Sequence, residues 1–415
     1  MPLYRFAFIL LPLLFWLSCT NEKEASFIEE EPENVLSFEE DTPALTKEDY
    51  LYMRYRQEAA EIAASLTDAQ LAGQCLLTGL DNRPFLTGAI KSLLREIPVG
   101  GAMLFGYNLS ATNEELRAFL SDFSEFVTDL CGIAPFIAVD HEGGVVHRFG
   151  PELMRLPPPA SFWDMALTQG EHVALAVVEN LTRISGEEIR SLGISLNLAP
   201  VAEILSAENK AFLETRSYGT DPDFVEKAAS AFIRAMDAAG IASAVKHFPG
   251  NSADDPHFGS SVISADHDEL DLMVRPFANI ISGVRPAAVM VSHSIVLAID
   301  PQRNASLSHN VISTWLRGEM GFDGIVLADD FTMRAISSNK ISLEEAVVEA
   351  FNAGVDMVMC WSSNIALIHN TMLLALQDGR LKRERLLEAV ERILAEKLRY
   401  GLVPATLFLT ETDHE

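Results

Sequence analysis

The chain has 415 residues, of which 48% are hydrophobic and 22% charged. This composition allows one large barrel or two ordinary domains and excludes a chain that is disordered throughout. The formal net charge of −28 argues against nucleic acid or an anionic membrane surface as a partner, because both need a cationic face. Four cysteines are too few for a disulfide scaffold.

Residues 1–19 are predicted to be an export signal. Arg5 precedes an apolar run from Phe6 to Leu17, which is shorter than the ~20 residues of a membrane-spanning helix. Ser18 and Cys19 follow this run and resemble a bacterial lipoprotein processing site. We therefore expect an exported protein anchored to a membrane through lipidated Cys19. An ordinary signal peptide cut nearby is the alternative.

The segment 20–48 is acidic and has no hydrophobic period, which predicts a solvated, flexible tether. We expect a single catalytic domain over residues 49–402 and a C-terminal tail over residues 403–415. The other three cysteines lie in apolar surroundings and are expected to be buried free thiols: Cys75, Cys131 and Cys360.

Eight short apolar runs alternate with amphipathic stretches, which predicts parallel strands covered by helices. Eight such units in about 350 residues predict an α/β fold, the (β/α)8 TIM-type barrel. A doubly wound open sheet is the alternative, although no Gly-rich phosphate-binding turn follows the first run. The runs are 74–78, 101–105, 136–140, 194–199, 242–247, 288–293, 325–329 and 356–360.

Helix boundaries are marked in the intervening segments. Thr112 and Ser342 each begin a capping box, and Asp221-Pro222 supplies a cap followed by a first-turn proline. Glycines that directly precede strands are expected to end helices: Gly193, Gly240 and Gly354.

Ionisable residues close four of the runs. They are Asp140, the pair Lys246-His247, His293 and Asp329, and a polar loop after the fifth run holds Asp254, Asp255 and His257. One such residue is often only a cap, but four at the carboxyl end of one barrel predict an active site. Mixed carboxylates, histidines and lysine suit acid–base chemistry on a polyhydroxylated ligand. A metal site is the alternative. We expect no metal, because no His-x-His or His-Glu-x-x-His pair is present.

Lys246-His247-Phe248-Pro249-Gly250 resembles the KHFPG motif of glycoside hydrolase family 3, in its β-N-acetylglucosaminidase branch. The resemblance covers roughly residues 60–402 and implies the short, barrel-only form of the family. Further matching stretches follow in family order: 66–79, 99–108, 139–144, 197–201, 216–222, 290–293, 321–324, Asp329 and 392–402.

The resemblance implies a retaining mechanism through a covalent glycosyl-enzyme intermediate. Asp329 is then the nucleophile, and Asp330 is the neighbour most easily confused with it. The implied general acid/base is His257, with Asp255 as the carboxylate that orients it. For His257 the alternative is a histidine on a surface loop.

The resemblance also implies sugar-binding positions at Asp140, Arg148, Arg216, Lys246 and His247, and a position near the site at His293. For Lys246 an internal ion pair is the alternative.

The sequence departs from the family pattern at three places. Asn251-Ser252 replaces the usual His-Gly, Pro256 stands inside the usual Asp-Ser-His, and Val145 replaces an arginine. The loop from Lys246 to His257 is also about two residues shorter than usual. These changes concern the acid/base loop and the substrate rather than the nucleophile.

The predicted function is a retaining exo-β-N-acetylglucosaminidase acting on peptidoglycan fragments or related glycans, with no cofactor and a monomeric state. Within enzymes the alternatives are a family 3 β-glucosidase or β-xylosidase, and a phosphorylase. A non-catalytic sugar-binding lipoprotein is the alternative from another class.

Overall fold

The computed structural model describes residues 46–80, 83–109, 111–253, 259, 261–333, 336 and 341–404. The predicted signal segment, Cys19 and almost all of the predicted tether lie outside the described residues. So do Asp254, Asp255 and His257 of the predicted acid/base loop.

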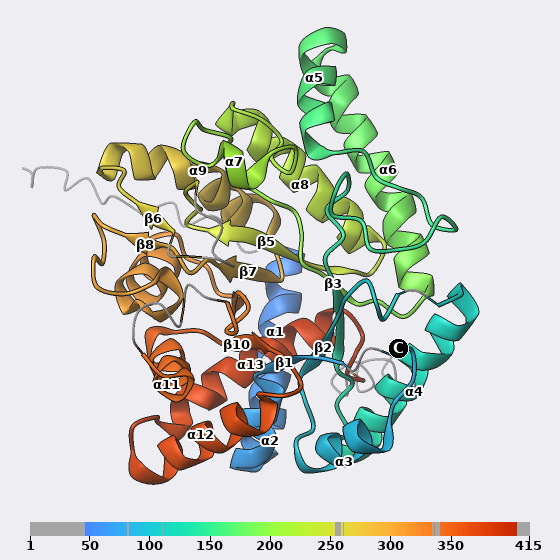
Figure 1. Ribbon diagram of the computed structural model, residues 1–415, viewed down its shortest axis with the longest axis vertical. Helices are drawn as coiled ribbons and strands as arrows, with labels where there is room; N and C mark the ends of the chain where they lie inside the picture. The colour runs from blue at the N-terminus through green and yellow to red at the C-terminus, as the bar shows by residue number, and fades with distance from the viewer. Residues whose placement is uncertain are drawn as a thin grey trace, which may run out of the picture. The chain divides into compact units, whose positions relative to one another are not determined.

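Eight parallel strands form a closed barrel in the order β1-β10-β9-β7-β5-β4-β3-β2. The predicted (β/α)8 barrel is therefore confirmed, and the open sheet is excluded because both edges are paired (Figure 1). The strands are β1 (Leu76–Gly79), β2 (Gly101–Leu104), β3 (Phe136–Val139), β4 (Leu196–Asn197), β5 (Ala242–Phe248), β7 (Ala288–Val291), β9 (Ile325–Ala328) and β10 (Met357–Cys360).

Helices surround the barrel and connect successive strands. The first and last of them, α1 and α13, pack against each other (Figure 1). The helices are α1 (Lys47–Ser65), α2 (Asp68–Gln74), α3 (Gly88–Glu96), α4 (Asn113–Cys131), α5 (Pro159–Gln169), α6 (Glu171–Ser191), α7 (Lys210–Leu213), α8 (Pro222–Ala238), α9 (His267–Val284), the 3-10 helix η1 (Ala305–Leu307), the π-helix η2 (Asn310–Glu319), α11 (Leu343–Ala353), α12 (Ile365–Asp378) and α13 (Arg383–Arg399).

The local signals in the sequence form the caps that they predict. Thr112 and Ser342 each accept a hydrogen bond from the third backbone amide of their helix and complete a capping box. Asp221 caps α8, and Gly354 ends α11 in the left-handed region. Thr46 caps α1, so this helix begins two residues before the expected start of the domain.

Most barrel strands are buried on both faces, as expected for parallel strands between helices and a filled interior. The barrel also forces one very close approach between backbones. A Cβ atom added at Gly100 would lie 1.9 Å from the carbonyl oxygen of Gln74, so only glycine fits just before β2.

Two strands outside the barrel were not predicted. β6 (Val262–Ile263) and β8 (Ile295–Val296) pair in parallel beside it (Figure 1). Two residues are too few to show a hydrophobic period, and these strands follow β5 and β7 at the end where the candidate site residues lie.

The opposite end of the barrel carries a buried charge cluster of its own. Asp356, the first residue of the eighth predicted run, is fully buried just before β10. Three arginines bind its carboxylate at 2.5, 2.6 and 3.3 Å: Arg317, Arg385 and Arg392. Burial alone would raise the pKa of Asp356, but these arginines lower it below its ordinary value. We regard this cluster as structural, because it lies at the amino-terminal ends of the strands.

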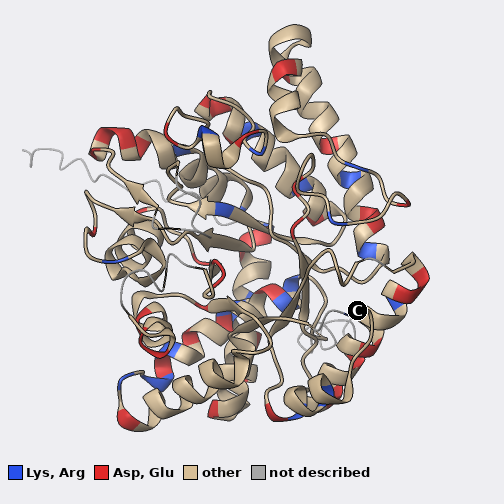
Figure 2. Cartoon of the chain, in the orientation of Figure 1, with Lys and Arg blue, Asp and Glu red and all other residues tan. Residues whose placement is uncertain are grey.

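Charged positions are spread over the outer helices and loops, whereas the barrel strands are mostly uncharged (Figure 2). Within the described residues, no helix is long and apolar enough to span a membrane. Cys75 and Cys360 are buried free thiols as predicted. Cys131, at the end of α4, is only half-buried.

Candidate active site

Two carboxylates and two cations form a compact cluster at the carboxyl ends of β3 and β5. Lys246 Nζ lies 2.7 Å from Asp140 Oδ1 and 2.6 Å from Glu142 Oε1. Arg216 donates to both oxygens of Glu142, at 2.8 and 2.9 Å. Glu142 thus joins the lysine to the arginine, and the cluster brings three of the predicted sugar-binding residues together.

Burial and charge pairing act in opposite directions on this cluster. Burial alone would raise the pKa of Glu142, but Lys246 and Arg216 hold it well below its ordinary value. Burial alone would lower the pKa of Lys246, but Asp140 and Glu142 raise it. The bound partners therefore keep Glu142 and Lys246 charged across the neutral range.

A glycine turn brings Glu142 into the barrel mouth. Gly143 has a φ of 97°, and a Cβ atom there would lie 2.5 Å from the carbonyl oxygen of Pro157. Only glycine combines that backbone conformation with so close a neighbour. The Glu-Gly-Gly sequence is therefore a local requirement for turning the chain directly after β3.

His247 is held by a buried glutamate that follows β4. Its Nδ1 lies 2.6 Å from Glu203 Oε1, and this carboxylate also accepts hydrogen bonds from the backbone and side-chain nitrogens of Asn251. A carboxylate only accepts, so Nδ1 carries the proton. Asn251, which departs from the family pattern, thus fixes the start of the predicted acid/base loop.

Asp329 and Asp330 follow β9 and point to different partners. Asp329 is 7% exposed, and its Oδ1 accepts a hydrogen bond from the Asp330 amide at 2.8 Å. The Asp330 carboxylate instead accepts from the amide and hydroxyl of Thr332 and, at 3.1 Å, from Trp361 Nε1. The two neighbouring acids are therefore in different settings, as the alternation of side chains predicts.

His293 is fully buried behind Asp330. Its Nδ1 lies 2.7 Å from the Ser306 hydroxyl and its Nε2 lies 3.1 Å from the Asp330 carbonyl oxygen. Burial lowers the pKa of His293, so the ring is neutral near pH 7. A carbonyl can only accept, so Nε2 donates to Asp330 and Nδ1 accepts from Ser306. His293 therefore positions the backbone beside Asp329.

The model of the glycosyl hydrolase family 3 N-terminal domain matches residues 80–395, which is most of the chain. The chain belongs to glycosyl hydrolase family 3.

Several proteins that the chain resembles are named β-hexosaminidases. The chain is 32% identical over 272 residues to a β-hexosaminidase of Tolumonas auensis, covering 65% of this chain and 77% of that protein. It is 28% identical over 385 residues to β-hexosaminidase A of Pseudoalteromonas piscicida, covering 84% of this chain and 64% of that protein. The family, and the resemblance to its hexosaminidase branch, are confirmed.

The fold matches a solved family 3 enzyme. The structure of a β-N-acetylglucosaminidase from Paenibacillus sp. str. FPU-7 superposes with a TM-score of 0.76 at 30% identity. The match covers 82% of this chain and 64% of that chain. This family 3 chain thus spans less than two thirds of the length of both this enzyme and the Pseudoalteromonas protein.

The described residues place most of the predicted site residues together. Asp140, Arg216 and Lys246 share the ionic cluster, and Lys246 forms the internal ion pair that was its alternative. His247, His293 and Asp329 lie at neighbouring strand ends. Arg148 is exposed after β3. Its sugar contact remains a prediction, as do the roles of His257 and Asp255.

Sequence reasoning missed three residues that complete this family 3 site: Glu142, Glu203 and Trp361. Glu142 lies within a motif that matched the family, but the sequence analysis assigned no role to it. Trp361 directly follows the eighth run, so reading the first polar or aromatic residue after each strand would have found it. Glu203 lies six residues beyond β4, and no local pattern marks it.

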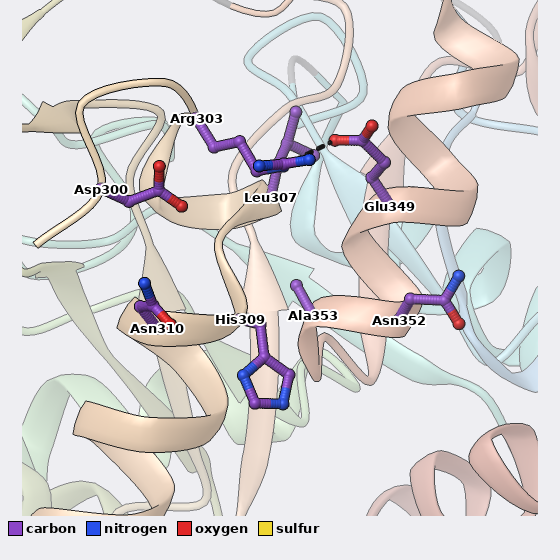
Figure 3. Close-up of a pocket in the computed structure, with 8 residues that line it drawn as sticks. All are labelled: Asp300, Arg303, Leu307, His309, Asn310, Glu349, Asn352 and Ala353. Carbon is purple, nitrogen blue, oxygen red and sulfur yellow. Dashed lines mark hydrogen bonds and ion pairs between the residues drawn. The ribbon is translucent and has the colours of Figure 1, made fainter. Parts of the chain in front are cut away.

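Other polar groups nearby are separate from this cluster. A pocket of about 310 Å³ is lined by residues that include Asp300 and Leu307, and in it Arg303 reaches toward Glu349 (Figure 3). η1 contributes Leu307 to this pocket, and its Ser306 binds His293. Among the described residues, no three His, Cys, Asp or Glu side chains come together as metal ligands.

Proposed function

We propose that the chain is a retaining exo-β-N-acetylglucosaminidase that releases terminal β-linked N-acetylhexosamine from peptidoglycan fragments or related glycans. One observation carries the proposal. A buried aspartate, Asp329, directly follows β9, which is separated by one strand from the Lys246 strand β5, in a barrel whose relatives include β-hexosaminidases.

The proposed chemistry has two steps. In the first, the carboxylate of Asp329 attacks the anomeric carbon while His257 protonates the departing oxygen. In the second, His257 takes a proton from a water molecule whose oxygen attacks the anomeric carbon, and the bond between that carbon and Asp329 breaks, which releases the sugar. The hydrogen bond from the Asp330 amide to Oδ1 holds the attacking carboxylate in one orientation. Asp255 is proposed to fix the tautomer of His257.

Exposure indicates which cluster members reach the sugar. The side chain of Asp140 is 24% exposed, whereas those of Lys246 and Glu142 are 3% and 1% exposed. Asp140 is therefore the open acceptor for sugar hydroxyls, and Arg216, at 16%, is the open donor. Lys246 is proposed to act indirectly, because its ion pair holds the Asp140 carboxylate in place.

The proposed location is outside the cytoplasm, with lipidated Cys19 as the anchor and the acidic segment that precedes Thr46, the cap of α1, as the tether. The support is the apolar run from Phe6 to Leu17, its single preceding arginine and the Ser18-Cys19 pair.

A panel of aryl glycosides, assayed with and without phosphate on the protein lacking residues 1–19, tests the activity. We expect the β-N-acetylglucosaminide to turn over far faster than the β-glucoside and β-xyloside, with no need for phosphate. Preference for the glucoside would contradict the specificity, and dependence on phosphate would indicate a phosphorylase. Turnover of none would leave a sugar-binding protein. Asp329→Asn is the control for contaminating activity.

A further inference from the structure

Three aromatic rings stack at the mouth of the barrel, on the side that the ionic cluster does not occupy. The rings of Phe105 and Trp361 are 4.5 Å apart between centroids and 12° from parallel. Tyr107 continues the stack, 5.6 Å from Phe105 and 25° from parallel. We call these three residues the aromatic ladder.

The ladder is assembled from strands far apart in the sequence. Phe105 directly follows β2 and Trp361 directly follows β10, and the two strands flank β1 in the barrel (Figure 1). The intervening strand ends at Gly79. A Cβ atom there would lie 3.3 Å from Trp361 Cε3 and 3.4 Å from Phe105 Cε2. A glycine at this position leaves the space in which the two rings meet.

The inner end of the ladder is tied to the predicted nucleophile. Trp361 Nε1 donates to Asp330 Oδ2 at 3.1 Å, and Asp330 is the neighbour of Asp329. From there the ladder runs by way of Phe105 to Tyr107, next to the exposed Gly106. All three rings are half-buried, so each keeps part of its surface open.

The mouth therefore has two chemically different halves. Its polar half, on β3, β5, β7 and β9, offers charged and hydrogen-bonding groups to sugar hydroxyls. Its aromatic half, on β10, β1 and β2, offers flat apolar surface. A pyranose ring has both an apolar C–H face and polar edges. One sugar of a disaccharide can therefore form hydrogen bonds with the polar half while the sugar on the other side of the scissile bond packs against the aromatic half.

We propose that the aromatic ladder is the subsite for the leaving-group sugar, a pyranose that stacks on Trp361 and Phe105. This inference rests on the proposed function and deepens it. It assigns the enzyme to glycans with at least two linked sugars, because a lone terminal sugar fills only the polar half. The ladder begins beside the proposed nucleophile and continues to Tyr107, next to the exposed Gly106, and this is the path that the proposal gives to the departing sugar.

The test compares a substrate with a leaving-group sugar and one without. The substrates are the β-1,4-linked disaccharide of N-acetylglucosamine and N-acetylglucosaminyl fluoride, whose leaving group has no ring. In Trp361→Ala we expect kcat/KM for the disaccharide to fall at least tenfold relative to that for the fluoride. The conservative variants Trp361→Phe and Phe105→Leu separate stacking from positioning. The first keeps a ring but loses the hydrogen bond to Asp330, and should preserve the ratio; the second keeps bulk but loses the ring, and should lower it.

Phe126→Ala on the outer helix α4 is the matched control and should leave the ratio unchanged. An unchanged ratio in Trp361→Ala, or equal losses on both substrates, would overturn the proposal. Failure of the proposed function gives a different result, because the wild type would then cleave neither substrate. Binding still tests the ladder in that case: in Asp329→Asn, adding Trp361→Ala should weaken binding of the disaccharide but not of the monosaccharide. If Asp329→Asn binds the disaccharide equally well with and without Trp361→Ala, the proposed role of the aromatic ladder is rejected.

Discussion

The hydroxyl oxygens of Ser252 and Ser261 lie 3.0 Å apart and close the base of the loop that contains His257. Ser261 is fully buried, and its oxygen also accepts from the Ser252 amide at 2.9 Å and from the Ser294 hydroxyl at 2.9 Å. Ser261 therefore accepts hydrogen bonds both from Ser252, before the loop, and from Ser294, after β7. Contacts at Ser252 and Ser261 therefore fix the two ends of the segment that contains the predicted acid/base.

We predict that Ser261→Ala weakens catalysis without removing the nucleophile. The substitution leaves the Ser252 amide and the Ser294 hydroxyl without this acceptor, which costs about 1–3 kcal/mol of stability. Turnover of disaccharides should fall more than turnover of aryl glycosides, because only the disaccharides need the proton that His257 is proposed to supply. Steady-state kinetics on both substrates measure this. Ser282→Ala, at an exposed serine in α9, is the control. Equal effects on both substrates would mean that Ser261 does not act through the loop.

Asp329→Asn should be inactive on every substrate, since no glycosyl-enzyme intermediate can form without the carboxylate. His257→Ala should depend on the leaving group. A nitrophenolate departs with little help, whereas a sugar alkoxide needs the proton, so disaccharide turnover should fall by about 10²–10⁴-fold. Asp255→Asn should lie between these two. Equal losses for His257→Ala on both substrates would remove the histidine from the acid role and direct attention to Asp254 or Asp330.

Removing one charged partner from the ionic cluster should destabilise the fold more than removing two opposite charges together. Glu142→Gln leaves Lys246 and Arg216 without the carboxylate between them, and we expect a loss of about 3–5 kcal/mol in the free energy of unfolding. The double variant Glu142→Gln with Lys246→Met should recover part of this loss. Urea denaturation measures both. Glu187→Gln, in an exposed pair with Arg183, should have little effect. A small effect of Glu142→Gln would contradict the assignment.

The same cluster predicts a window of pH in which it stabilises the fold. The pKa of Glu142 is lowered in the folded state, so its contribution is present above ~4.3 and is lost as the pH falls below that value. The pKa of Lys246 is raised, so its contribution is present below ~10.4 and is lost at still higher pH.

His141 should make the fold sensitive to mild acid. Burial, with a smaller effect from His147, lowers the pKa of His141 to about 3. The unfolded chain then binds a proton near pH 6.5 that the folded chain does not, so stability falls with pH from there downward. The wild type should lose about 2 kcal/mol more free energy of unfolding than His141→Gln when the pH is lowered from 7 to 5. The difference in stability between the two proteins should therefore narrow by that amount. Exposed His309 supplies the control, His309→Gln. A difference that does not change with pH would argue against a buried neutral ring.

Lipidation of Cys19 predicts that the expressed full-length protein partitions into detergent. Cys19→Ala should move it to the aqueous phase, and mass analysis of the N-terminus should show the modified cysteine. A wild-type protein found in the aqueous phase and cut elsewhere would support an ordinary signal peptide instead.

Local physics explains why the barrel and its helix boundaries were predictable. A parallel strand buried on both faces must be apolar throughout, and helix ends need side-chain caps and glycines at adjacent positions. Capping by Thr112 and Ser342, and eight strands in chain order, depend only on residues near one another in the sequence. Asp140, Lys246 and Asp329 could be picked out for the same reason, because each stands where an apolar run ends.

The partners of those residues were decided only by the closed barrel. Glu142 lies between Lys246 and Arg216. Glu203, in the loop after β4, binds His247 in β5. These partners are far apart in the sequence, and no periodic pattern connects them. Lys246 could be placed at a strand end, but whether its charge meets a sugar or a carboxylate depends on which strands become neighbours. The meeting of Phe105 and Trp361 over Gly79 has the same origin, since closure puts β2 and β10 on either side of β1. The sequence alone determined where chemistry could occur along the chain, whereas the closure of the sheet determined which groups neutralise, orient and stack on one another, because only folding brings their side chains within contact distance.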